Sequence, residues 1–413
     1  MSKISQINNF VFKKYFEAIK FEYEHDILYH DYYSSKTNIK LVPKPFAVQK
    51  VLSNYGNIIN FIIPIIIPFW IILIHPLTVS FFFIKYLIKS LSYKKEIVAE
   101  SIYLDASDNK YFLSINNKDI GYPEMVIVFP FRKTDSEPIP NLKQINLFSL
   151  TNPLLFIKSA ICSFYVIWKL VFSLEKRMIF YSYTAFTWFL VYFTLRNNGI
   201  NSVWLSNQYD RWIGLVSKLP ETEVTIVQHG QLYFYDHKNK AELFPRFSQK
   251  IRNVNKIYTI NKLSKKYFKL YIENKDLKFL LMESNLELIS WRATNPLACK
   301  ILIVGNHIQM PFQMEIVKEL YSRYGDNVDI SYKYHPRQKN KVTYNSLWEI
   351  HKKNILPNAD IVISYGSSID YEIEQTINCE IQFYDYLDNN SISELISNIE
   401  KIIKLNYNAI KIG

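Results

Sequence analysis

Short apolar runs alternate with segments of helical periodicity from about Asn198 onward. Each run is rich in β-branched and aromatic residues, which is typical of buried strands. The predicted strands are Val203–Leu205, Val224–Val227, Ile257–Ile260, Ile301–Val304, Val328–Tyr332, Ile361–Ile363 and Ile381–Phe383. Strands that alternate with helices predict an α/β fold, with parallel sheets covered by helices on both faces.

An uncharged apolar segment runs from Ile58 to Ile84 and is long enough to span a bilayer. Three prolines interrupt it, namely Pro64, Pro68 and Pro76. A straight span would leave backbone groups unpaired in hydrocarbon, so we predict a kinked, shallow or re-entrant insertion. Lysines follow at Lys85, Lys89, Lys94 and Lys95, as expected where an apolar wedge meets anionic headgroups. We therefore predict a membrane-associating segment over residues 58–91, with a buried helical pair as the alternative.

A second apolar region, Leu154 to Phe172, is interrupted only by Lys158 and Lys169. This spacing leaves an amphipathic face beside a very hydrophobic one. The region is therefore expected to be either a second interfacial helix or a core helix between domains.

With 413 residues, the chain is long enough for two domains. The polar stretch Ser290–Pro296 precedes the strand that begins near Lys300. We therefore predict an acceptor-side domain over residues 1–296 and a nucleotide-donor domain over 297–413. A last helix, Ile392–Leu405, could return to the first domain.

The chain contains 49 Lys and Arg residues and 37 Asp and Glu residues, which gives a formal charge of +12. This positive charge favours an anionic partner. The lysines are scattered and no nucleic-acid-binding signature is present, so a membrane surface or a phosphorylated substrate is preferred to nucleic acid. The cysteines, Cys162, Cys299 and Cys379, are too widely spaced for a zinc or disulfide framework, which fits a reducing cytosol. The N-terminus lacks the pattern of a signal peptide, so we expect a cytoplasmic protein.

Two groups of candidate residues follow strands of the first domain. Gln228-His229-Gly230 comes directly after Val224–Val227. An imidazole there could act as a general base, and Gly230 would allow a ligand to approach closely. The alternative is a strand-end histidine bonded to a loop. Asp210, which follows Val203–Leu205, is a second candidate base.

Further candidates follow strands of the second domain, where open α/β sheets collect ligands. In His335-Pro336-Arg337 the proline fixes the turn, and both neighbours could donate to a phosphate. Gly366-Ser367-Ser368 joins a strand to the predicted helix Ile369–Glu374, whose first amides would be free to hold a phosphate. The alternatives are a solvated turn and an ordinary N-cap.

Three more residues of the second domain could complete the site. Glu372 lies one helical turn beyond Ser368, where it could bind a ribose, and Asn306 and His307 follow Ile301–Val304. The chain contains no P-loop, no GxGxxG and no DxD pair after a strand. We therefore expect neither a required metal nor a cofactor beyond the donor substrate.

These residues resemble motifs of GT-B glycosyltransferases. His335-Pro336 and Ser367-Ser368 are similar to the HP and S-S/T motifs of bacterial sialyltransferases, including those that make lipooligosaccharide and polysialic acid capsule. The same pairs resemble the CDP-glycerol glycerophosphotransferases of teichoic acid and capsule assembly, whose histidine-glycine motif is closer to Gln228-His229-Gly230. The resemblance covers about Asn198 to Ile396.

The resemblance implies a GT-B fold of two facing Rossmann-like domains, with the apolar segment as a membrane-associating helical insertion in the N-terminal half. His335, Ser367 and Ser368 would hold the phosphate of a cytidine nucleotide. Gln228-His229-Gly230 stands where the sialyltransferases carry an acidic base motif. This departure either gives the role of base to His229 or removes sialic acid as the donor.

We therefore expect a metal-independent, inverting glycosyltransferase, peripheral on the inner face of the cytoplasmic membrane. It would transfer a sialic-acid-type sugar from a CMP-sugar to a bacterial surface polysaccharide or lipooligosaccharide. His229 or Asp210 would take the acceptor proton, and His335 would act with the phosphate-binding residues on the leaving nucleotide. The alternatives are a CDP-glycerol-type glycerophosphotransferase and a non-catalytic, membrane-associated assembly protein.

Overall fold

Parallel sheets organise both units of the computed structural model, Met1–Met282 (unit 1) and Glu283–Gly413 (unit 2). The structure describes residues 3–37, 57–90, 99–105, 112, 115, 122–129, 142–172, 176–206, 210–228, 235–236, 241–242, 247–260, 262, 264–282, 286–292, 295, 297–306, 310–335, 347–352, 355–365, 368–384 and 391–407. The α/β class with parallel sheets that the sequence predicts is therefore present.

The sheet of unit 1 has seven parallel strands in the order β3-β2-β1-β4-β5-β8-β9. Their bounds are β1 Ser101–Asp105, β2 Met125–Val128, β3 Lys143–Asn146, β4 Ser202–Leu205, β5 Glu223–Val227, β8 Val254–Thr259 and β9 Lys278–Leu281. A separate antiparallel pair joins β6 (Tyr235–Asp236) to β7 (Ala241–Glu242). The order of the sheet reverses between β1 and β4, which is where Rossmann-type sheets collect ligands.

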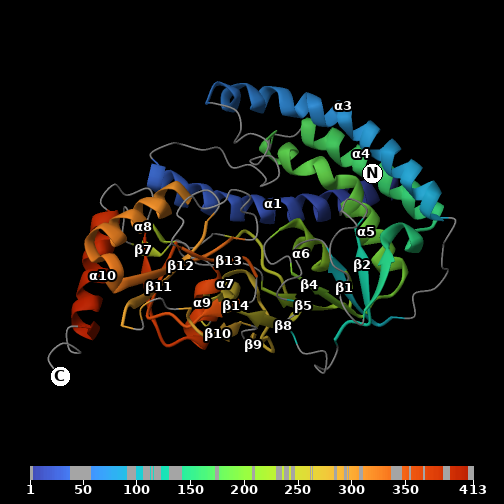
Figure 1. Cartoon of the computed structure of the whole chain (residues 1–413). Coiled ribbons are helices and arrows are strands. Elements are labelled where there is room, and N and C mark those ends of the chain that lie inside the picture. The colour runs from blue at the N-terminus through green and yellow to red at the C-terminus, as the bar shows by residue number, and fades with distance from the viewer. Residues whose placement is uncertain are drawn as a thin grey trace. The chain divides into compact units, whose positions relative to one another are not determined.

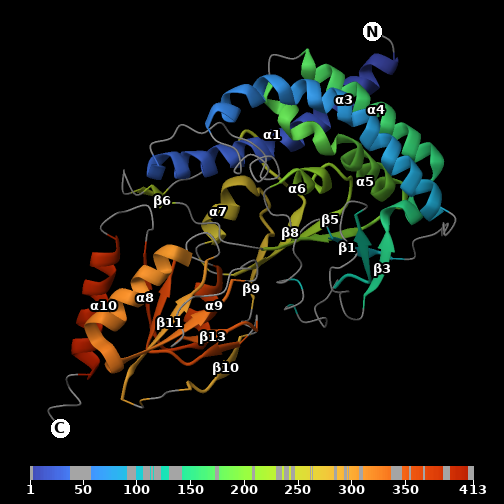
Figure 2. The ribbon, with the colours of Figure 1, turned by 45° about the horizontal axis from the view of Figure 1, so that its top comes forward.

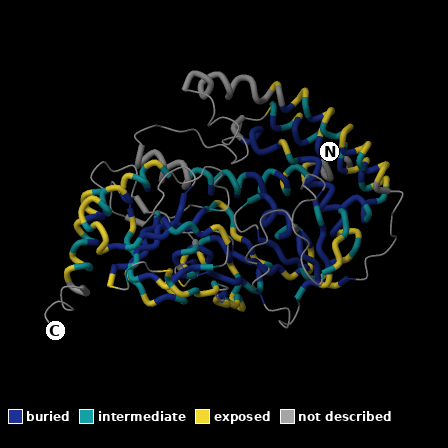
Figure 3. The backbone as a smooth tube through the Cα atoms, in the orientation of Figure 1, coloured by how far each residue is buried: buried dark blue, intermediate teal, exposed yellow. Residues whose placement is uncertain are grey.

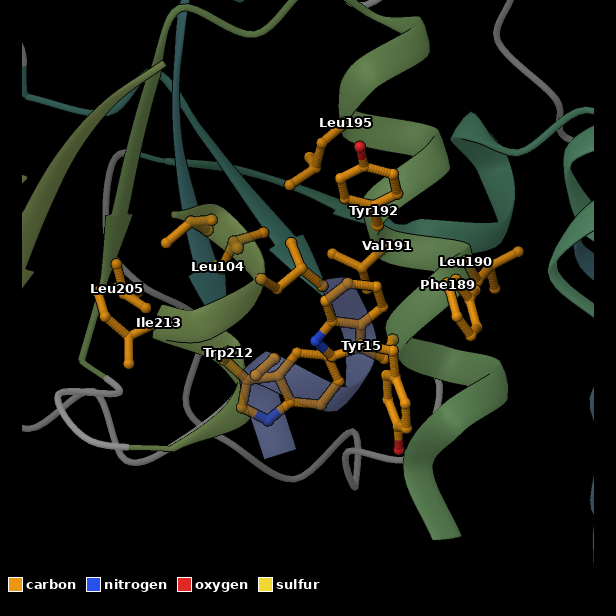
Figure 4. Packing of buried hydrophobic residues seen from close by; sticks show 14 of the residues in the cluster. Tyr15, Leu104, Phe189, Leu190, Val191, Tyr192, Leu195, Leu205, Trp212 and Ile213 are labelled. Carbon is orange, nitrogen blue, oxygen red and sulfur yellow. The ribbon is translucent and has the colours of Figure 1, made fainter. Parts of the chain in front are cut away.

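The helices of unit 1 pack around a large apolar core (Figure 1). They are α1 (Lys3–Thr37), α3 (Asn57–Ser90), α4 (Pro153–Val171), α5 (Ala185–Asn197), α6 (Arg211–Val216) and α7 (Ser264–Tyr271), with 3-10 turns η2 (Leu147–Leu150) and η3 (Lys176–Thr184). Leu104 and Leu205 face this core from the sheet, while Tyr103 and Trp204 lie outside it, as strand alternation requires. Figure 4 shows the two leucines in one cluster with Tyr15, Phe189 and Trp212.

Helix α5 is the centre of this core, because all its side chains from Ala185 to Leu195 are buried. The rings of Trp188 and Phe189 lie 5.2 and 5.4 Å from the ring of Tyr15 on α1. A helix that is apolar all round is buried either in a protein core or in a membrane, and α5 is buried in the core of unit 1. By length and hydropathy α3, α4 and the η3–α5 segment could each cross a membrane, yet the third is 89% buried.

The apolar segment of the N-terminal half is one helix, α3, which continues through Pro64, Pro68 and Pro76. It contains no re-entrant turn, so that part of the sequence-based expectation is corrected. Prolines remove single hydrogen bonds from a helix without ending it when the surrounding chain supports the remaining bonds. Helix α3 runs beside α4 (Figures 1 and 2). The N-cap of α4 is Asn152, whose side chain accepts from the backbone N–H of Leu155 at 2.9 Å.

Unit 2 has a five-stranded parallel sheet in the order β13-β12-β11-β15-β16. The strands are β11 Cys299–Val304, β12 Val328–Lys333, β13 Trp348–Ile350, β15 Ile361–Ser364 and β16 Glu380–Phe383, and a parallel pair joins β10 (Glu287–Ile289) to β14 (Ile355–Pro357). The helices are α8 (Met310–Tyr324), α9 (Ser368–Thr376) and α10 (Ser391–Tyr407), with the turn η4 (Gly325–Asn327). Helices α8 and α10 share one apolar core with the sheet, and α9 packs into a core on the opposite face.

All seven predicted strands are present, in β4, β5, β8, β11, β12, β15 and β16. The predicted helix at Ile369–Glu374 lies within α9, and the last helix, α10, packs on α8 and β16 of unit 2. The division between the units falls at Met282, earlier than residue 296, and the intervening β10 pairs with β14 of unit 2.

Candidate functional site

The carboxyl ends of the strands of unit 2 bring several candidate residues to one edge. Asn306 follows β11, His335 follows β12, and Tyr365 follows β15. Strands β11 and β15 are neighbours, and the chain leaves them toward opposite sides of the sheet. Such a topological switch point forms a crevice in which α/β proteins bind ligands. Of the predicted residues, Asn306 and His335 therefore share the edge with the start of α9.

Buried hydrogen bonds hold the end of β11 in place. Gln313 of α8 is fully buried, and its Oε1 accepts from the backbone N–H of Asn306 at 3.0 Å and from the hydroxyl of Tyr332 at 2.7 Å. Its Nε2 donates to the carbonyl of Val304 at 2.8 Å and to the hydroxyl of Tyr384 at 2.7 Å. A satisfied buried network of this kind fixes a loop precisely. The backbone at Asn306 is thus preorganised.

Gly305 is required by the close approach of β12 to this loop. Its N–H donates to the carbonyl of Lys333 at 2.7 Å. A Cβ at this position would lie 2.5 Å from that carbonyl oxygen and 2.9 Å from the ring of Tyr332. Only glycine fits without displacing one of the two strands.

The start of α9 carries its own anchor. The hydroxyl of Ser364, the last residue of β15, donates to Oδ1 of Asp370 at 2.6 Å, and Asp370 is buried in the first turn of α9. The carboxylate therefore lies at the end of the helix that attracts anions. A phosphate at this turn would share the helix end with Asp370.

The other predicted residues of unit 2 are placed only in part. Glu372 is half-buried on α9, and its carbonyl accepts from the hydroxyl of Thr376 at 2.6 Å. Ser368 begins α9, but its side chain is outside the described part of the structure. Pro336, Arg337, His307, Gly366 and Ser367 lie outside the described residues.

In unit 1, Gln228 is placed at the end of β5 and His229 and Gly230 lie outside the described residues. The side chain of Gln228 is fully buried; it donates to Ser264 Oγ at 2.7 Å and accepts from the N–H of Ile260 at 3.0 Å. Gln228 thus joins β5 to the end of β8 and to α7 inside unit 1.

Asp210 is the N-cap of α6, with its Oδ1 accepting from the N–H of Trp212 at 2.9 Å. The next residue, Arg211, is buried and forms a bidentate ion pair with Glu22 of α1, with Nε and Nη2 2.6 and 2.7 Å from the two carboxylate oxygens. Arg211 also donates to the carbonyl of Tyr181 and to the hydroxyl of Thr184. This network joins α6 to α1 and η3.

Asp26 belongs to the same network and is absent from the sequence-based candidates. The hydroxyl of Tyr181 donates to its Oδ2 at 2.7 Å. Burial, reinforced by the negative charge of Glu22, raises the pKa of Asp26 well above its ordinary value. A carboxyl group in this environment can hold and release a proton at less acidic pH than usual. The one sequence signal was the spacing of Glu22 and Asp26, which places two acids on one face of a helix.

Changing Asp26 to asparagine is expected to stabilise the protein progressively as pH rises. The ordinary pKa of an Asp side chain, 3.8, applies to the unfolded chain, and the pKa of Asp26 in the folded chain is well above it. At a pH between the unfolded and the folded pKa, the folded chain keeps a proton that the unfolded chain has lost. Stability of the wild type therefore falls as pH rises through this interval, whereas the amide of the variant does not titrate. Melting temperatures measured from about pH 4.5 to 8 should diverge in favour of the variant. Parallel curves would contradict the raised pKa, and the exposed Asp276→Asn controls for the lost charge.

Within the described ranges, no group of three or more His, Cys, Asp or Glu side chains is arranged to hold a metal ion.

No protein-family model matches the chain, and no curated protein matches it in sequence. Solved structures do match, among them one described as "Crystal structure of GtfA/B complex", with a TM-score of 0.33 and 9% sequence identity. The alignment covers 52% of this chain and 53% of that chain, so this chain spans about half the length of that neighbour. A likeness at this level does not establish a common fold.

Proposed function

We propose that the protein is a glycosyltransferase that binds its nucleotide-linked donor at the carboxyl edge of the unit 2 sheet. The observation that carries this proposal is the switch point between β11 and β15, where Asn306, His335 and the start of α9 converge. The buried support under Asn306 and the close approach at Gly305 suit a rigid binding site. His335 together with Ser367 and Ser368 would stabilise the departing phosphate.

A CMP-sugar of the sialic-acid type is the proposed donor, and a glycan or lipid-linked glycan of the bacterial surface is the proposed acceptor. Both follow from the resemblance of His335-Pro336 and Ser367-Ser368 to sialyltransferase motifs. His229 is the preferred base, because the carboxylate of Asp210 already caps α6. Asp26 is a further candidate, since its raised pKa suits proton transfer.

A nucleotide screen tests the proposal directly. Thermal unfolding of the full chain is measured with CMP, CDP, UDP, GDP or ADP, since a ligand that binds only the folded state stabilises it by about 2.7 kcal/mol at a hundredfold excess over Kd. CMP is expected to give the largest shift. A larger shift with CDP would move the donor to CDP-glycerol, and product analysis would then show a phosphodiester in place of a glycosidic bond. No shift with any nucleotide, in folded protein, would refute the nucleotide site and favour a non-catalytic assembly protein.

A further inference from the structure

Helices α3 and α4 expose an unusual share of the large apolar side chains of this protein. Among the described residues, 14 of the 22 large apolar side chains that are exposed belong to these two helices, and Phe172, the C-cap of α4, is another. On α4 they are Leu154, Ile157, Ile161, Phe164 and Trp168, whose spacing places them on one helical face, and the C-cap Phe172 follows. Soluble proteins scatter such residues singly and rarely gather them, so this concentration marks a binding surface.

The exposed residues of α3 continue the same surface and include Leu73, Leu77, Phe81, Ile84 and Ile88. Figure 3 shows exposed positions along both helices. We call the exposed sides of α3 and α4 together the α3/α4 face.

Direct contacts join the two helices into one face. His75 of α3 lies 3.0 Å from the hydroxyl of Ser163 on α4, and its ring meets the ring of Phe164 edge-on at 4.8 Å. Phe164 is itself one of the exposed residues. Burial lowers the pKa of His75 to about 4, so the imidazole is neutral at cellular pH and places no charge at this junction.

The charge of the two helices selects the partner. Neither α3 nor α4 contains an Asp or a Glu, and both contain lysines. The ammonium group of Lys85 lies 4.6 Å from the ring centre of Phe81, and Lys158 of α4 is exposed beside Leu154, Ile157 and Ile161 in the sequence. Apolar side chains beside cations suit an anionic lipid leaflet, in which the chains enter the acyl region and the lysines meet headgroups.

The sides of α3 and α4 opposite the α3/α4 face pack on the core, and this packing sets the orientation of the two helices relative to the membrane. Phe82 and Tyr86 of α3 pack on Phe148 of η2, and Phe156 of α4 packs on Phe186 of α5. Helix α5 is buried and belongs to the core beneath the sheet. If α3 or α4 crossed the bilayer, the rest of unit 1 that packs on it would be carried into hydrocarbon. If both helices lie in the plane of the membrane, the rest of unit 1 stays outside the bilayer.

We propose that the α3/α4 face lies in the plane of a membrane and inserts into its anionic leaflet, so that the protein is monotopic. This proposal is independent of the reaction at unit 2.

Vesicle flotation of the full-length protein tests the proposal, with phosphatidylcholine vesicles that contain or lack phosphatidylglycerol. A Leu77→Glu/Ile161→Glu variant is expected to bind at least about tenfold more weakly, because two inserted side chains are lost. The matched control is Leu297→Glu in unit 2, since Leu297 is 72% exposed and lies outside the face. It should bind like the wild type. Equal binding by all three proteins, each shown to be folded by circular dichroism, would overturn the proposal.

A Lys85→Gln variant separates the electrostatic contribution to membrane binding from the contribution of the inserted apolar side chains. Loss of one lysine near the surface costs about 1 kcal/mol, or about fivefold in binding, and only on vesicles that contain phosphatidylglycerol. The same loss on neutral vesicles would contradict an anionic leaflet as the partner.

Two outcomes would assign the face to another occupant and refute the proposal. A lipid-free dimer of the wild type that the Leu77→Glu/Ile161→Glu variant abolishes would make the face an interface between copies of the chain. Retention in the membrane after alkaline carbonate extraction would show that the helices span the bilayer. Monotopic binding predicts release by carbonate. It also predicts bromolipid quenching of the wild type that Trp168→Phe weakens.

Discussion

Replacing Arg211 with Ala is expected to lower the free energy of unfolding of unit 1 by about 3–5 kcal/mol. The guanidinium is buried and is the partner of both carboxylate oxygens of Glu22. Its removal leaves the negative charge of Glu22 in a site with little water, beside Asp26, whose hydroxyl partner is Tyr181. The loss of one partner of a buried ion pair is far more destabilising than the pair is stabilising.

Urea denaturation followed by tryptophan fluorescence measures this loss. The matched control is Arg252→Ala, since the ion pair of Arg252 with Glu273 is exposed and such pairs contribute about 0–1 kcal/mol. A Glu22→Gln/Arg211→Met variant should recover most of the stability, because it removes both charges together. If Arg211→Ala behaved like the Arg252 control, the network would have no role in stability.

Replacing His335 with Ala is expected to reduce sugar transfer by at least about a hundredfold, the usual effect of losing one donor to a developing negative charge. His335 follows β12 at the switch-point edge and is only half-buried, so the substitution leaves the core of unit 2 intact. Turnover should fall more than the nucleotide affinity, because the histidine is proposed to act on the leaving phosphate. Steady-state kinetics and nucleotide titrations with the two proteins separate these effects.

His351→Ala provides the control for that experiment. His351 follows β13, the next strand along the same edge, and stacks on Tyr334 with ring centres 4.3 Å apart. It is a histidine of unit 2 on the side of β12 away from the switch point. Equal losses in the two variants would show a general effect on this edge, and full activity of His335→Ala would remove His335 from the site.

The seven predicted strands could be found because each is a short run of β-branched and other apolar residues whose signal is local, whereas β9, β10, β13 and β14 were not predicted. Strand β3, Lys143–Asn146, has no such signal, since it is an edge strand with its first two residues exposed. The prolines of α3 suggested a broken segment, but the helix continues through them. Whether a proline ends a helix depends on the surrounding tertiary structure, which the sequence does not reveal locally.

In the candidate site, too, some features could be predicted from the sequence and others could not. The residues after β11, β12 and β15 could be found because parallel strands end at one edge. The contacts of Gln313 and the meeting of Glu22 with Arg211 could not, because they join separate elements through side chains. No periodicity along the chain encodes such pairs.

The ion pair between Glu22 and Arg211 also has a consequence for synthesis on the ribosome. The two residues are 189 positions apart, so at about 5–20 residues per second Glu22 waits roughly 10–40 s for its partner. During that interval Tyr15 on α1 also lacks the rings of Trp188 and Phe189 that later cover it. The first helix to be made is therefore fixed in place only after about half of the chain has been synthesised, and nascent chains shorter than about 211 residues should leave it open to proteases.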